Sequence, residues 1–129
     1  MTKIVTPEKF YGFKPGTDRK LVRWDKVVEY FWKLDKGSER IKVCEAGKTT
    51  MGHPMLVAYV SSKENLANLD QIKQDTWSIS HPEDLTEAEV DRIINEGKSV
   101  VAMTMSIHAS EVGGTQMVSD FTYNLLTSE

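Results

Sequence analysis

The sequence predicts an α/β fold in which helices cover both faces of a mixed sheet. Three observations favour it: helical spacing of apolar residues over residues 24–36, two short strand candidates at 40–45 and 55–60, and an almost continuous apolar run at 99–107. Two further helices are expected between the second and third of these segments and one at the end, so the predicted order is helix, two strands, two helices, strand and helix. This mixed order indicates helices that cover a mixed sheet.

Length and charge narrow the possible functions. The 129 residues suit a single domain, expected over residues 1–129. Sixteen Lys and Arg against 19 Asp and Glu give a net charge of −3, so no basic field would attract nucleic acid or an anionic membrane. No apolar stretch approaches the roughly 20 residues of a membrane-spanning helix. The single cysteine excludes an intrachain disulfide and a cysteine metal cluster, but it leaves the cellular compartment undetermined.

The N-terminal part of the chain is expected to form an arm followed by a helix. Residues 1–23 are rich in turn residues, and the aromatic side chains of Phe10, Tyr11 and Phe13 are expected to attach this arm to the body. From residue 24 the apolar residues recur on one helical face: Trp24, Val27, Val28, Phe31 and Leu34. The sequence therefore predicts a helix over residues 24–36.

A hairpin and two helices are expected next. A short strand candidate at 40–45, with Ile41 and Val43 on one face, and an apolar run at 55–60 flank a loop, which predicts a hairpin of paired strands. Ser61 and Glu64 have the spacing of a capping box, so a helix is expected over about 62–76. A second capping box at 86–89 opens another helix, which Gly97 closes.

The run at 99–107 has the length and composition of a strand covered on both faces. After residues 108–114 a last helix is expected, with its apolar face formed by Met117, Val118, Phe121 and Leu125.

His108 and Glu111 are the candidate metal ligands. They follow the predicted buried strand, where α/β folds place ligands, and a turn there could aim both side chains at one point. Imidazole nitrogen and carboxylate oxygen both bind zinc. Gly113 and Gly114 would allow a tight backbone conformation beside the metal.

The spacing alone leaves a structural alternative open. A His and a Glu three residues apart occur by chance in about one such sequence in four. In that case His108 would bond a backbone carbonyl and Glu111 would stabilise the first turn of the last helix. His53, in the hairpin loop, and His81, before Pro82, are expected to be turn or capping residues rather than ligands.

Two motifs resemble those of the M14 zinc carboxypeptidases. Residues 106–111 are similar to the His-x-x-Glu zinc motif of that family, which also follows a buried strand. Residues 47–55 are similar to its Gly-x-(Ser/Thr)-x-x-Gly-x-Pro hairpin, and the helix at 24–36 corresponds to the one before that hairpin. The similarity covers about residues 20–127.

The resemblance implies a Zn²⁺ ion held by His108, Glu111 and a third ligand, a His on a later strand. It implies a metallocarboxypeptidase that removes C-terminal residues from peptide substrates with a metal-activated water. The family's general base and carboxylate-binding arginines lie further downstream, so no catalytic residue is expected in this chain. Residues 1–129 are therefore expected to be the N-terminal portion of the catalytic domain, with an incomplete carboxypeptidase-like fold, and inactive alone. Ser110 and Val112 stand where many members have Arg and Trp, which affects contacts with the substrate.

Two alternative functions remain at this stage. One is a related zinc deacylase of N-acyl amino acids, and the other is a non-catalytic α/β interaction module without metal. Because a buried strand at 99–107 would need neighbours on both edges, the chain is also expected to self-associate through exposed sheet edges.

Overall fold

The computed structural model describes residues 4–128, which divide into two compact units, residues 4–66 with 104–128 and residues 67–103. The elements are α1 (Pro7–Tyr11), α2 (Trp24–Gly37), β1 (Ile41–Lys48), β2 (Pro54–Val60), α3 (Lys63–Ala67), α4 (Leu69–Ser80), the 3-10 helix η1 (Pro82–Asp84), α5 (Glu87–Glu96) and α6 (Val112–Thr127). Within the described residues, no helix has both the length and the apolar character needed to cross a bilayer.

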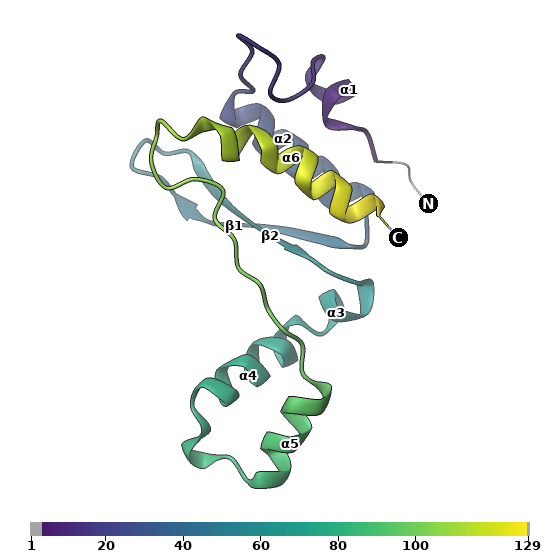
Figure 1. The fold of residues 1–129 in the computed structure, drawn as a ribbon, viewed down its shortest axis with the longest axis vertical. Helices are drawn as coiled ribbons and strands as arrows, with labels where there is room; N and C mark the ends of the chain where they lie inside the picture. Colours follow the sequence, from purple (N-terminus) through teal and green to yellow (C-terminus); the bar gives the residue numbers. More distant parts are fainter. Residues whose placement is uncertain (1–3, 129) are drawn as a thin grey trace. The chain divides into compact units, whose positions relative to one another are not determined.

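The hairpin and the helices above it form the centre of the first unit. Strands β1 and β2 pair antiparallel, which confirms the predicted hairpin. Ile41 and Val43 alternate onto the face that packs against α2, because successive side chains of a strand point to opposite faces. Helices α2 and α6 lie side by side over the strands (Figure 1). On the other face of the hairpin, Val57 and Tyr59 are exposed.

Helix α2 has the position that the sequence predicts, and Val27, Phe31 and Leu34 of the predicted face are buried. Tyr30 is buried as well, whereas Trp24 and Val28 are only half-buried. Tyr30 is fully buried, and its hydroxyl donates to the Val5 carbonyl oxygen at 2.8 Å. Burial raises the pKa of Tyr30 well above its usual value, so the phenol stays protonated and the bond to the arm persists.

The N-terminal arm is attached by its aromatic residues, as expected. The rings of Phe10 and Tyr11 lie 5.1 and 5.5 Å from that of Tyr30. The Tyr11 hydroxyl is 2.7 Å from the hydroxyl of Ser119 on α6. The arm therefore joins α2 and α6.

Helix α6 is anchored at both ends by hydrogen bonds. Near its start, the Gln116 side chain accepts from the Val22 N–H at 2.7 Å and donates to the Val22 carbonyl at 3.0 Å. At its end, the Arg40 guanidinium donates to the carbonyl oxygens of Leu126 and Ser128 at 3.2 and 3.1 Å. These bonds give hydrogen-bond partners to the backbone of Val22 and to carbonyl groups at the end of α6, where the helix itself supplies none.

The predicted apolar face of this last helix is wrong in part. Met117 and Leu125 are exposed, and the buried positions are Gln116, Ser119, Thr122 and Leu126. The helix is rotated relative to its apolar stripe because the hydrogen bonds of Gln116 and Ser119 to the arm fix its orientation.

The helix expected over 62–76 is interrupted at Asn68, which separates α3 from α4. Its first cap is Ser62 rather than Ser61, since the Ser62 hydroxyl accepts from the Asn65 N–H at 3.2 Å. The Ser61 hydroxyl instead accepts from the Asn65 side-chain amide at 2.9 Å.

The second unit consists of α4 and α5 joined by η1. Asp75 on α4 is 8% exposed and accepts from the Arg92 guanidinium of α5 at 2.7 Å and from Gln71 at 2.9 Å. The hydrogen bond to Arg92 lowers the pKa of Asp75, so the pair stays ionised and holds the two helices together. The capping box of Thr86 and Glu89 is present as predicted, and Gly97 caps the end of α5.

The predicted strand at 99–107 is wrong, since these residues form no regular element. Val101 and Ile107 are 78 and 82% exposed. A strand is stabilised by a neighbour, and in the described part of the chain β1 and β2 pair only with each other. The expected mixed sheet is therefore a two-stranded antiparallel sheet, whose one face α2 and α6 cover. This mixture of helix and sheet is compatible with the α/β class.

Replacing Gln116 with Leu should lower the free energy of unfolding by about 2–4 kcal/mol, because the buried N–H and carbonyl of Val22 lose their partners. Urea denaturation followed by circular dichroism measures the change. The matched control is Asn124→Leu at an exposed position of the same helix, expected within about 0.5 kcal/mol of wild type. Equal losses in both variants would contradict the anchoring role.

Candidate metal-ligating site

His108 and Glu111 lie in the turn that precedes α6, with Glu111 at its N-cap position. The imidazole Nδ1 of His108 is 2.8 Å from the carboxylate Oε1 of Glu111. Both side chains are accessible, with exposed fractions of 73 and 51%. The structure therefore brings together the two residues that the sequence singled out.

Backbone groups orient the Glu111 carboxylate. Its Oε2 accepts from the N–H groups of Ile107 at 3.1 Å and His108 at 3.0 Å. The Glu111 N–H donates to the His108 carbonyl at 3.0 Å, and the Ser106 hydroxyl donates to the Glu111 carbonyl. The hydrogen bond from His108, followed by the two backbone N–H groups, lowers the pKa of Glu111. The carboxylate is thus held in its ionised, ligand-competent form.

The two glycines after Glu111 differ in what they contribute. Both lie in the first turn of α6, and neither has a positive φ. A Cβ at Gly114 would lie 1.8 Å from the Met105 carbonyl oxygen, whereas a Cβ at Gly113 would meet nothing within 4 Å. The expected tight backbone conformation is therefore a close approach of two segments at Gly114.

The other two histidines have the structural roles that the sequence predicts. His53 is exposed in the hairpin loop, where its N–H donates to the Thr49 hydroxyl at 3.1 Å. His81 is the C-cap residue of α4, and its ring stacks on Trp77 with centroids 4.0 Å apart.

The donor types at the turn suit zinc, although they make only part of a site. Among residues 4–128, no group of three or more His, Cys, Asp or Glu side chains is placed to hold a metal ion. Two donors bound at 2.0–2.2 Å to one tetrahedral zinc lie about 3.4 Å apart. The pair at 2.8 Å would have to open by roughly half an ångström, a small rotation for exposed side chains.

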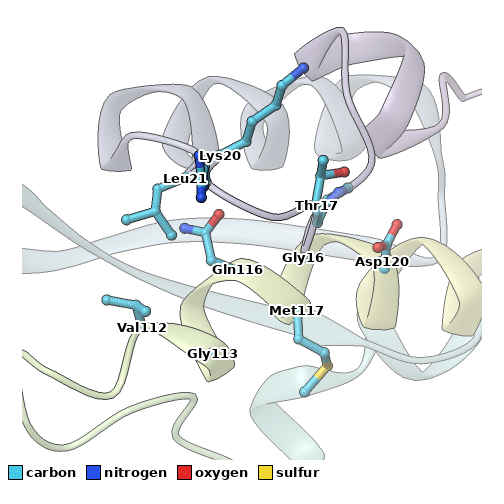
Figure 2. A pocket seen from close by; sticks show the side chains of 11 residues that line it. Gly16, Thr17, Lys20, Leu21, Val112, Gly113, Gln116, Met117 and Asp120 are labelled. Carbon is cyan, nitrogen blue, oxygen red and sulfur yellow. The ribbon is translucent and has the colours of Figure 1, made fainter.

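A cavity of about 490 Å³ lies beside this turn, between the arm and the first half of α6 (Figure 2). Leu21, Val112 and Met117 give it apolar walls, while Lys20 and Asp120 add charges of opposite sign. Burial raises the pKa of Asp120. The lining therefore does not define a single class of ligand.

Two residues that support the site were missed in the sequence. Ser106 bonds the Glu111 carbonyl, and Gln116 fixes α6 to Val22. For Gln116 the signal would be a polar residue at a buried position of α6. That burial is visible only once the orientation of the helix is known.

The His108–Glu111 pair is thus accessible at the start of α6, and its role can be weighed against what the chain is similar to. The family model of the zinc carboxypeptidases, peptidase family M14, matches residues 27–129. The chain therefore belongs to the M14 zinc carboxypeptidase family. No curated protein and no solved structure matches it significantly.

The lowered pKa of Glu111 predicts how the turn responds to acid. A carboxylate with a depressed folded-state pKa stabilises the turn above its unfolded pKa of about 4.3, and this contribution is lost as the pH falls through the folded value. The amide signals of Ile107 and His108 in NMR spectra should shift together, with a midpoint below about 4.3. Glu111→Gln should abolish this titration. A wild-type midpoint at or above the usual value would contradict the hydrogen-bonded geometry.

Proposed function

We propose that this chain is the N-terminal portion of a metallocarboxypeptidase catalytic domain and that His108 and Glu111 are two of its three zinc ligands. The observation that carries the proposal is the 2.8 Å approach of His108 Nδ1 to Glu111 Oε1, within a region that matches the family over residues 27–129. Because the matched region runs through both compact units, we assign both to one domain.

Hydrogen bonds within the turn orient His108 and Glu111 as a pair of ligands. The backbone N–H groups of Ile107 and His108 hold Oε2 of Glu111, which leaves Oε1 directed at the imidazole. Such outer hydrogen bonds orient metal ligands and increase their affinity. When bound, zinc would activate a water molecule and polarise the scissile carbonyl of a peptide substrate.

The remaining parts of the proposed active site lie outside residues 1–129. A catalytic zinc site commonly has three protein ligands, and the described residues bring no three candidate ligands together. We therefore expect the isolated chain to release no amino acid from a peptide with a free C-terminus. Release that a chelator blocks would contradict this expectation. The alternative function, a zinc deacylase, would be tested in a longer protein containing this chain by assaying N-acyl amino acids beside peptides.

Zinc binding tests the proposed ligand pair directly. Titration of the 129-residue chain with Zn²⁺, followed by the NMR signals of the histidine rings, should perturb His108 selectively. His108→Ala should weaken binding by more than about 10-fold because a ligand is lost. His53→Ala and His81→Ala, which alter histidines outside the pair, should bind as the wild type does. Equal zinc binding in all three variants would contradict the assignment, and a wild type that binds no zinc would favour an interaction module without metal.

We also propose that copies of the chain associate through the hairpin. Strands β1 and β2 pair only with each other within residues 4–128, so each has a free edge, and Val57 and Tyr59 expose apolar surface beside it. Exposed apolar strand edges favour pairing with another chain.

The mass measured by light scattering should therefore rise with protein concentration. Val57→Lys should reduce the rise, since a charge on an edge strand opposes pairing. Met51→Lys, in the loop of the same hairpin, is the matched control and should leave it unchanged. A strictly monomeric wild type at high concentration would contradict the association.

A further inference from the structure

We propose that Gly114 is a positioning residue for the His108–Glu111 pair, acting through the backbone of Met105. The inference rests on the proposed function insofar as the pair binds zinc. Gly114 has no side chain with which to reach either ligand. Its contribution is the absence of a side chain at the point where the segment entering the turn passes over the first turn of α6.

The contact at Gly114 leaves no space for a methyl group. A Cβ there would lie 1.8 Å from the Met105 carbonyl oxygen and 2.8 Å from its carbon. Atoms at such distances overlap, and the obstacle is backbone that cannot rotate away. Since the φ of Gly114 is not positive, the requirement is for space rather than for an unusual conformation.

The carbonyl of Met105 is directly connected to the groups that orient the ligands. Ser106, Ile107 and His108 follow it, and each donates a hydrogen bond to Glu111. If Met105 is pushed away from α6, these three donors move away from the helix start, where Glu111 is fixed as the N-cap residue. The carboxylate then loses the bonds that set its direction, and the imidazole loses its partner.

The adjacent glycine provides a matched control. Gly113 lies in the same helical turn and borders the cavity of Figure 2, and a Cβ there would meet nothing within 4 Å. Both Gly→Ala changes raise the helix propensity of α6 by similar amounts. A difference between Gly113→Ala and Gly114→Ala therefore reports the contact with Met105.

The experiment compares the wild-type 129-residue chain with the two variants in three measurements. Amide hydrogen exchange of Ile107 and His108 in metal-free protein reports the turn, a Zn²⁺ titration followed by NMR reports the ligand pair, and thermal unfolding reports the whole fold. Gly114→Ala should speed the exchange of both amides and weaken zinc binding by about 10-fold or more, as loss of outer-shell support does. Gly113→Ala should stay within about twofold of wild type in both.

Each other outcome is decisive. Unchanged amide exchange and zinc affinity in Gly114→Ala would overturn the positioning role and leave the proposed function intact. If the wild type bound no zinc, the proposed function would fail, while the amide exchange would still test the positioning. A Gly114→Ala chain that is unfolded where Gly113→Ala is folded would also overturn the role, since the contact would then support the whole fold.

Discussion

The paired hydrogen bonds between the Gln116 side chain and the backbone of Val22 are the constraint on which the arrangement of the first unit depends. They join the N-terminal arm to α6 in a buried environment, where an unpaired amide or carbonyl is costly. Because Gln116 must face the arm, α6 buries Ser119 and Thr122 and turns Met117 outward. The orientation of the helix therefore follows its hydrogen bonds rather than its apolar stripe.

The candidate metal site depends on the same helix. Glu111 is the N-cap residue of α6, so the anchoring that orients the helix also places this carboxylate. The segment that leads into the turn passes over Gly114 at Met105. Its backbone N–H groups then donate to one carboxylate oxygen of Glu111, and the His108 ring lies beside the other. The pair is thus exposed to solvent, yet its geometry is set by backbone. This combination suits ligands that must be accessible to an ion and substrate.

Apolar surface remains uncovered in the first unit. Val57 and Tyr59 are exposed on the hairpin, Met117 on α6 and Ile107 in the segment before the turn. Moving an apolar side chain out of water lowers the free energy, so these surfaces favour association. The proposed place of this chain within a larger M14 catalytic domain agrees with this picture, since the rest of that domain would then cover such faces.

The sequence by itself determined the local elements and the family. Helical spacing located α2, the loop between two strand candidates located the hairpin, and the capping box at Thr86 located the start of α5. Each of these signals depends on neighbours a few residues apart. The tertiary structure decided the rest. The run at 99–107 has the composition of a strand, but a strand requires a partner that composition does not specify. Likewise, the approach of His108 to Glu111 depends on the position of Met105 against Gly114, a contact fixed by packing and not by the spacing of residues.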